Sequence, residues 1–269
     1  MTLLRSLAMA LSCFSKVPVP QVDWKPESMR YMMCFFPVVG LIIGVVLALW
    51  WLLCDAVGFG SVLRGTGLVL LPVALTGGIH LDGFCDVVDA QSSHAEPARK
   101  REILKDPHVG AFAAIGVASY LIAYVAVAID FCSVVVVQAH TDELSVVVPL
   151  VLLGCVQLLS RCASGLATVL FAQSSGEGML ATFQQSAEKR PVVIALAIEF
   201  VVVAVVACLV SPIAGIVMLV MCLLCLVGLR IFAQTQFGGM SGDLAGCFLQ
   251  VAEMAMFVGL LIVVHVVGL

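Results

Sequence analysis

Seven long apolar stretches constrain the fold of this chain more than any other feature. Each holds at most one Asp, Glu, Lys or Arg and is close to or above the roughly 20 residues that a helix needs to cross a bilayer. The stretches cover residues 31–53, 62–79, 109–129, 144–172, 192–210, 213–233 and 244–269. They are continuous rather than alternating, which favours spanning helices over the strands of a membrane barrel. We therefore predict an all-α, polytopic membrane helix bundle with about seven transmembrane helices.

Composition excludes a soluble globular enzyme. Apolar residues make up 62% of the chain and charged residues 11%, against roughly 45–50% and 25% in an average soluble domain. The small net charge of −4 gives no support for nucleic-acid binding. The 11 cysteines are scattered, mostly in apolar stretches, which favours packing over disulfides or zinc. We predict one integral membrane domain over residues 1–269.

The first 28 residues are interpreted as an amphipathic arm. An apolar stretch follows Arg5, but Lys16 and two prolines come after it without a small-residue cleavage site, which is unlike a signal peptide. We expect a retained N-terminal interfacial helix on the surface of the bilayer.

The placement of the basic residues predicts the orientation. Eleven of the 13 Lys and Arg fall on one side of the bundle, ten of them in the arm or in connections and Arg230 near the end of the sixth stretch. The other side holds Arg64, with Asp55, Asp130, Asp142 and Glu143. By the positive-inside rule, the N-terminus is cytoplasmic. The short turn at Pro212 leaves open whether both stretches within 191–233 cross.

An acidic segment follows the second apolar stretch. Asp82, Asp86 and Asp89 are spaced i, i+4 and i+7, which places three carboxylates on one face of a continuing helix. Hard oxygen ligands that project together suit Mg²⁺ bound to a substrate phosphate. His80, just before them, is a candidate catalytic residue, although hydrogen-bonded packing is the alternative. Residues 80–108 are expected to form a cytoplasmic Asp-rich and basic loop, in which the active site faces the cytoplasm.

The basic residues of that segment divide into two groups. We interpret Arg99, Lys100 and Arg101 as a charge cluster that sets the membrane topology. Lys105 and Asp106 instead adjoin the entry to the third stretch. There Lys105 is a candidate for binding phosphate, and Asp106 is a candidate fourth carboxylate or general base.

Polar residues elsewhere add further candidates. Arg161 lies deep in the fourth stretch, where a cation needs a partner or an anion. Glu199 is a candidate partner, and phosphate binding by Arg161 is the alternative. Glycines at 238 and 239 leave backbone amides for an anion, with Asp243 as helix cap or metal ligand. The glycine-rich loop 172–178 is a weak phosphate-binding signal.

Three ordered motifs resemble the cobalamin synthase family of adenosylcobinamide-GDP ribazoletransferases. They are HLDGFCDVVD at 80–89, KDPHVG at 105–110 and GGMSGD at 238–243, and FSKVPVP at 14–20 and FPVVG at 36–40 extend the match. The resemblance implies a multi-pass inner-membrane transferase. It would join adenosylcobinamide-GDP to α-ribazole or its 5′-phosphate, release GMP and require Mg²⁺.

The resemblance also implies roles for individual residues. Asp82, Asp86 and Asp89 match the metal-binding acids, and Asp106 and Asp243 match the remaining motif carboxylates. We assign phosphate binding to Lys105, Arg161, Lys16, Gly238 and Gly239. The family usually has arginine where Lys16 stands; lysine keeps the charge but lacks the bidentate fork. The resemblance leaves room for a homo-oligomer or for association with other enzymes that assemble the nucleotide loop.

Two other classes of protein compete with this interpretation. Intramembrane prenyltransferases and CDP-alcohol phosphotransferases also bind diphosphates through Asp-rich helix ends. The phosphotransferase pattern continues with Ala-Arg, where this chain has Cys85 and Asp86. A divalent-cation transporter would need acids near the middle of the bilayer, whereas these acids lie at its edge.

Overall fold

The computed structural model describes residues 2–139, 144–175 and 178–267, which are helical apart from connecting segments and one isolated bridge between Gln173 and Met240. Six helices are long and apolar enough to cross a membrane. They are α3 (Phe36–Val57), α7 (Ala111–Ala139), α8 (Leu144–Leu170), α10 (Lys189–Val210), α11 (Pro212–Phe232) and α12 (Gly242–Val266). The prediction of an all-α polytopic bundle is confirmed.

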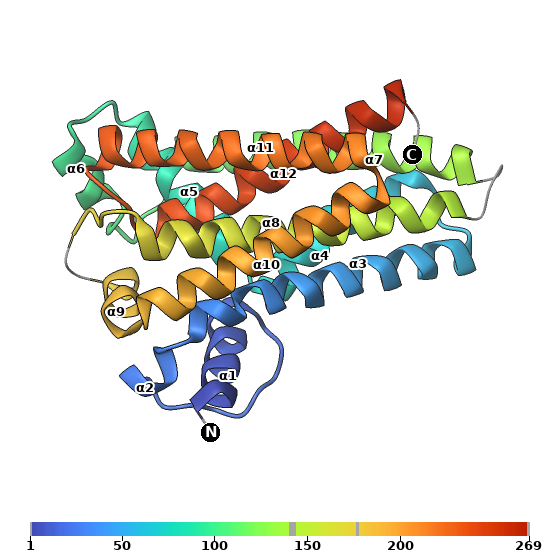
Figure 1. The fold of residues 1–269 in the computed structure, drawn as a ribbon. Coiled ribbons are helices and arrows are strands. Elements are labelled where there is room, and N and C mark those ends of the chain that lie inside the picture. Colours follow the sequence, from blue (N-terminus) through green and yellow to red (C-terminus); the bar gives the residue numbers. More distant parts are fainter. Residues whose placement is uncertain (1, 140–143, 176–177, 268–269) are drawn as a thin grey trace.

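Shorter helices complete the described part of the chain. They are α1 (Thr2–Phe14), α2 (Pro26–Met29), α4 (Ser61–Thr76), α5 (Ile79–Ser92), α6 (Pro97–Ile103) and α9 (Met179–Ser186), with a 3₁₀ turn η1 (Met32–Phe35) and a π-helical turn η2 (Ala233–Phe237). Figure 1 shows the long helices side by side, with α6 and α9 at one end of the bundle. The basic residues of α6 and those that open α10 therefore lie at the same end, as predicted.

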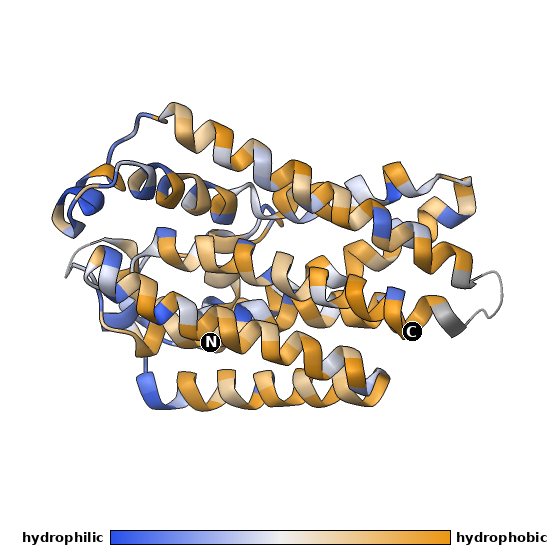
Figure 2. Ribbon diagram, turned by 90° about the horizontal axis from the view of Figure 1, so that it is seen from above, coloured by the Kyte–Doolittle hydropathy of each residue, from blue (hydrophilic) through white to orange (hydrophobic). Residues whose placement is uncertain are grey.

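The bundle has a packed centre and an apolar outer surface. Helix α8 contacts α3, α10 and α12, and its inner face is buried. Large apolar side chains stay exposed on the outer helices, for example Ile122 on α7, Leu209 on α10 and Leu224 on α11. Figure 2 shows that apolar residues cover most of the long helices, while strongly hydrophilic stretches gather around α5, α6 and α9. A lipid environment accounts for this distribution, because exposed apolar surface of this extent is unfavourable in water.

The second apolar stretch does not continue as one helix, so that prediction was wrong. Gly77 and Gly78 adopt positive φ angles of 66° and 79°, which end α4 and start α5 after a bend of 95°. The amides of both glycines still bond to carbonyl groups of α4, as in a helix C-cap. We therefore treat α4 as a short membrane segment and α5 as lying outside the membrane-spanning segments.

The end of α7 differs from the prediction, and the structure answers the open question about α10 and α11. Helix α7 continues ten residues beyond 129, because the carboxylate of Asp130 pairs with His265 Nε2 at 3.1 Å and the residues that follow are apolar. Helices α10 and α11 are both of spanning length, with Pro212 at the first position of α11. The predicted charges at 142 and 143, and residues 176–177 of the glycine-rich loop, lie outside the described residues.

The N-terminal arm contains the predicted helix and packs on the bundle. Helix α1 contacts α2, η1 and α3, and Ser6 Oγ donates a hydrogen bond of 2.8 Å to the carbonyl of Ser28. At the end of α1, the ring of Phe14 lies 4.4 Å from that of Phe36, measured between centroids. The arm thereby delivers Phe14 to the wall of an internal cavity.

Candidate active site

Glycines bring the acidic helix α5 against the start of α12. A Cβ added to Gly83 would lie 2.8 Å from the carbonyl oxygen of Asp243, and one added to Gly246 would lie 3.1 Å from that of His80. Both glycines are buried at this contact. Without side chains at these positions, the backbones approach closely enough to place Asp243 beside the acids of α5.

The carboxylates of α5 and α12 form one electrostatic group. Burial, followed by the negative charges of Asp82, Asp243 and Asp89, raises the pKa of Asp86 to about 6. The four carboxylates take part in none of the ion pairs that join described residues. Four acids that repel one another favour a bound cation.

The donor set fits Mg²⁺, although the ligand cage is incomplete. Among the described residues, no three His, Cys, Asp or Glu side chains are placed as a ready-made metal site. Mg²⁺ typically keeps several waters and takes one or two carboxylates together with substrate phosphates. Asp82 is exposed and Asp243 is partly buried, and both line adjoining cavities, so their oxygen donors remain accessible there. Asp86 is also partly buried, but it lines neither cavity. Asp89 lies instead against Gly110, where an added Cβ would be 2.1 Å from its Oδ1 atom.

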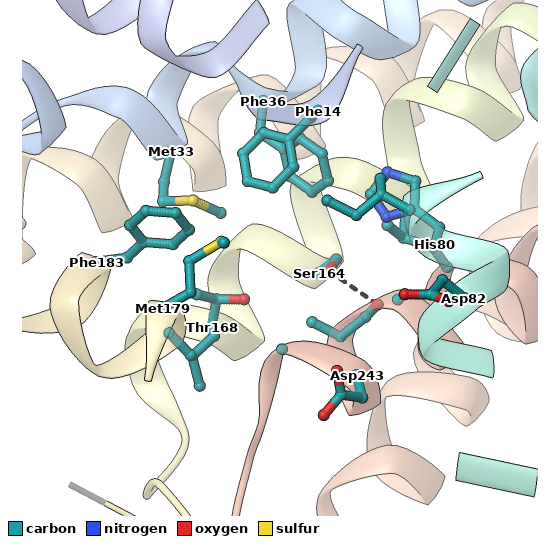
Figure 3. A pocket seen from close by; sticks show the side chains of 16 residues that line it. Phe14, Met33, Phe36, His80, Asp82, Ser164, Thr168, Met179, Phe183 and Asp243 are labelled. Carbon is teal, nitrogen blue, oxygen red and sulfur yellow. Dashed lines mark hydrogen bonds between the residues drawn. The ribbon is translucent and has the colours of Figure 1, made fainter. Parts of the chain in front are cut away.

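Two cavities meet at the start of α12. One has a volume of about 330 Å³ and is lined by aromatic and apolar side chains together with His80, Asp82 and Asp243. The other, of about 240 Å³, is polar and lined by Arg101 and Lys105 among others. Gly242 and Asp243 contribute to both cavities. Figure 3 shows Asp243 and Asp82 on one side of the first cavity and the aromatic residues on the other.

Sequence reasoning missed the structural part that α6 plays. Arg101 Nη1 donates to the carbonyl of Phe237 at 2.9 Å, and Lys100 Nζ donates to Gln236 Oε1 at 2.7 Å. Lys100 is only 4% exposed and also contacts Gln91. These residues attach α6 to η2 and place Arg101 in the polar cavity. The cluster therefore does more than set the membrane topology. Its structural role was missed because the partners of these cations are distant in sequence.

Asp106 lies apart from the two cavities that adjoin Asp243. Its Oδ1 atom accepts hydrogen bonds from the amide of His108 at 3.0 Å and interacts with His108 Nδ1 at 2.7 Å. The contact lowers the pKa of Asp106. Its side chain is 53% exposed and lines neither cavity. This position does not support the expected role of Asp106 as general base.

Arg161 has a different partner from the one expected. Its Nη1 atom pairs with Glu253 Oε1 at 2.7 Å and also donates to the carbonyl and side chain of Gln157, one turn before it on α8. Both side chains are buried, at 2% and 5% exposure. Pairing with Glu199 was therefore a wrong prediction. Because these contacts occupy Arg161 away from the two cavities, the geometry gives it a structural role and does not support phosphate binding.

The remaining candidates for phosphate binding, Lys16, Gly238 and Gly239, take part in backbone contacts instead. The amide of Lys16 donates to the carbonyl of Leu75 at 2.7 Å, and its side chain lies over Gly77. Gly239, with a φ angle of 149°, lets the chain pass the carbonyl of Gln173 at a distance that a Cβ would prevent. Gly238 lies beside Arg101 Nη1. None of Lys16, Gly238 and Gly239 lines either cavity at Asp243.

His80 lies at the bend between α4 and α5 and faces the aromatic cavity. It is 5% exposed, and its Nε2 atom has no hydrogen-bond partner. Burial, with a smaller effect from Arg161, lowers the pKa of His80 to about 3.

Fold and site together define a multi-pass helical membrane protein with an acidic site between the polar cavity, which Arg101 and Lys105 line, and the aromatic cavity. The family model described as cobalamin-5-phosphate synthase matches residues 6–261. The chain belongs to this family, and the resemblance inferred from its motifs is confirmed.

Three curated relatives match along nearly their whole length. The adenosylcobinamide-GDP ribazoletransferase of Lachnoclostridium phytofermentans is 39% identical over 251 residues, which cover 93% of this chain and 91% of that protein. The proteins of that name from Clostridium perfringens strain SM101 and Geobacillus kaustophilus are each 27% identical. Their matches cover 96% of both chains in the first case, and 93% of this chain and 92% of the relative in the second. No solved structure matches the chain.

Proposed function

We propose that this protein joins adenosylcobinamide-GDP to α-ribazole or its 5′-phosphate and releases GMP, in an Mg²⁺-dependent reaction. The observation that carries the proposal is the meeting of the acids of α5 and α12 where a basic cavity adjoins an aromatic one. A diphosphate with its metal needs cations and carboxylates side by side, and a heteroaromatic nucleoside needs an apolar surface nearby. The names of the relatives support these substrates.

The polar cavity is the proposed site of the diphosphate. Arg101 and Lys105 line it, and the N-terminus of α12 opens onto it through Gly242. Cationic side chains and the positive end of a helix dipole both favour phosphate oxygens. We assign phosphate binding to these groups in place of Lys16, Arg161, Gly238 and Gly239.

The acids have two proposed roles. Asp82 and Asp86 would hold Mg²⁺, which, when bound, neutralises charge on the diphosphate. Asp243 faces both cavities and accepts the proton of the attacking ribose hydroxyl. The hydroxyl oxygen bonds to the phosphorus that carries cobinamide while the bond from that phosphorus to the GMP oxygen breaks. Positioning and charge neutralisation supply most of the catalysis in such in-line displacements.

The proposed setting is the inner membrane, with the N-terminus and the active site facing the cytoplasm. Support comes from the eleven basic residues at the end of the bundle that holds the acids, ten in the arm or connections and Arg230 in the last turn of α11. The same end presents the polar cavity to nucleotide substrates.

Membranes that contain the protein test the proposed activity directly. We expect them to convert adenosylcobinamide-GDP and α-ribazole phosphate into a corrinoid nucleotide and GMP, measured by liquid chromatography. Activity should disappear with EDTA and return with added Mg²⁺. If the corrinoid stayed unchanged while CDP-alcohols or prenyl diphosphates reacted, the assignment would pass to one of those enzyme classes. Uptake of divalent cations without any group transfer would favour a transporter.

Replacing Gly83 with alanine should impair the reaction without changing any acid. The new Cβ would lie 2.8 Å from the carbonyl oxygen of Asp243, so the start of α12 must move away from α5. A displacement on the order of 1 Å costs about 10²-fold in rate in well-positioned sites. We expect a loss of at least about tenfold in kcat/KM and a higher Mg²⁺ requirement. The control is Gly154→Ala in α8, where an added Cβ meets nothing within 4 Å. Equal activity of both variants would contradict the tight contact.

A further inference from the structure

The aromatic cavity has a composition that the diphosphate chemistry does not explain. The rings of Phe14, Phe36 and Phe183 contribute to its wall together with Met33 and Met179. The ring of Phe14 lies 4.4 Å from that of Phe36 and 6.3 Å from that of Phe183, between centroids. Figure 3 shows these side chains on the side of the cavity away from Asp243. Such a wall suits a flat aromatic ligand.

His80 adds an unsatisfied polar group to this wall. Its ring lies 6.3 Å from that of Phe14 and 5.8 Å from that of Phe36, between centroids. The side chain is buried, and its Nε2 atom has no hydrogen-bond partner among the described residues. A buried polar group without a partner is costly, and in native proteins it usually has one. A ligand in the cavity would supply the missing hydrogen bond.

We propose that this cavity binds the dimethylbenzimidazole base of α-ribazole, with His80 donating a hydrogen bond to the ring nitrogen that carries no ribose. The inference rests on the proposed function and deepens it. An imidazole carries at least one N–H donor in either protonation state, and the free ring nitrogen of a benzimidazole is an acceptor. His80 is then a positioning residue rather than the catalytic residue that the sequence suggested.

The chemistry of the cavity favours this base over the other parts of the substrates. Guanine presents several polar atoms on its edges, and most of the cavity wall is apolar. The volume of about 330 Å³ is at the small end for ligand pockets and is too small for a corrin macrocycle. A benzimidazole has one ring acceptor and otherwise apolar surface, which matches one imidazole among aromatic side chains.

The same placement orients the reacting group. With the base among the phenylalanines, the attached ribose extends toward Asp82 and Asp243, on the other side of the cavity. There a ribose hydroxyl meets the diphosphate from the polar cavity, which shares Asp243 and Gly242. Binding energy from the base would thus align the nucleophile.

A matched pair of nucleosides tests the hydrogen bond. We would compare KM for α-ribazole and for the nucleoside of dimethylindole, in which a CH group replaces the free ring nitrogen, at saturating adenosylcobinamide-GDP and Mg²⁺. For the native protein we expect KM to be about 3–10-fold higher with the indole, at similar kcat, as one neutral hydrogen bond predicts. In His80→Phe, KM for α-ribazole should rise to the indole value, so that the ratio approaches one.

Several results would overturn the inference. One is a ratio of the two KM values near one in the native protein, and another is an unchanged ratio in His80→Phe. A third is an equal fall in kcat for both nucleosides in His80→Phe with the KM ratio kept, which would mark His80 as an acid–base catalyst. If the native protein formed no corrinoid product at all, the proposed function itself would fail. If product formed but KM did not differ between the two nucleosides, only the proposed site for the base would be rejected.

A second variant keeps the test valid if His80→Phe does not fold. Phe183→Leu removes one ring from the cavity wall but keeps an apolar side chain there. We expect KM for α-ribazole to rise about 2–10-fold, as for the loss of one aromatic pair, while KM for adenosylcobinamide-GDP stays the same. The control is Phe257→Leu, a buried ring that packs on Tyr124 and Phe131 and does not line the cavity. An unchanged KM for α-ribazole in Phe183→Leu would overturn the inference.

Discussion

Replacing Asp86 with asparagine is expected to reduce turnover by about 10²- to 10³-fold or more while the protein stays folded in the membrane. Burial and the charges of Asp82, Asp243 and Asp89 raise the pKa of Asp86, so a bound cation favours its ionised form. An amide of the same shape keeps the packing but loses the charge that holds the metal. The measurement is GMP release at several Mg²⁺ concentrations, with protein amount checked in the membrane fraction. Asp82→Asn should behave similarly.

The matched control for Asp86→Asn is Asp130→Asn. Asp130 is also a half-exposed helical aspartate, but it pairs with His265 in a contact between α7 and α12 remote from the two cavities. Its replacement should leave turnover within about twofold, as for most exposed positions. Near-normal activity of Asp86→Asn, or an equal loss in both variants, would contradict the metal assignment.

Replacing Glu253 with glutamine is expected to destabilise the fold more than any other single change that we consider. The substitution leaves the Arg161 guanidinium buried in the centre of the bundle without its counter-charge. Breaking a buried ion pair from one side typically costs about 3–5 kcal/mol. We expect a corresponding fall in the free energy of unfolding, measured by unfolding in mixed detergent micelles containing SDS.

Two companion variants interpret that result. Glu188→Gln removes an exposed ion pair with Arg30 and should leave unfolding nearly unchanged. The double variant Arg161→Met with Glu253→Leu removes both charges and should recover most of the stability, as in other buried pairs. It should also stay active, because Arg161 lines neither cavity. A stable but inactive double variant would show that Arg161 binds substrate, contrary to its placement here.

The sequence was sufficient to predict the elements that depend on local pattern. Continuous apolar stretches predict the long helices, and the spacing of Asp82, Asp86 and Asp89 predicts that they share a helix, as α5 confirms. The bend at Gly77 and Gly78 was missed because each glycine is compatible with a helix interior at a modest cost. Only the packing of α5 on α12 requires the chain to turn there.

Pairings between distant segments were not predictable from the sequence. Arg161 has acids available at both 199 and 253, and helix rotation, which apolar patterning leaves undetermined in a membrane, decides that Glu253 faces it. Similarly, Arg101 reaches the cavity because α6 packs on η2, more than a hundred residues later in the chain. Asp243 joins the acids of α5 through the glycine contact at Gly83, and a single sequence does not reveal such a contact.

The central claim, that acids of α5 hold one metal ion against the substrate diphosphate, is tested most directly by electron paramagnetic resonance with Mn²⁺ in place of Mg²⁺. Mn²⁺ would be titrated into the purified protein saturated with adenosylcobinamide-GDP, without nucleoside, so that no turnover occurs. We predict protein-bound Mn²⁺ with phosphorus hyperfine coupling in the native protein and in Asp130→Asn. The signal should be lost in Asp86→Asn and in Asp82→Asn. The same bound signal in all four proteins would contradict the claim.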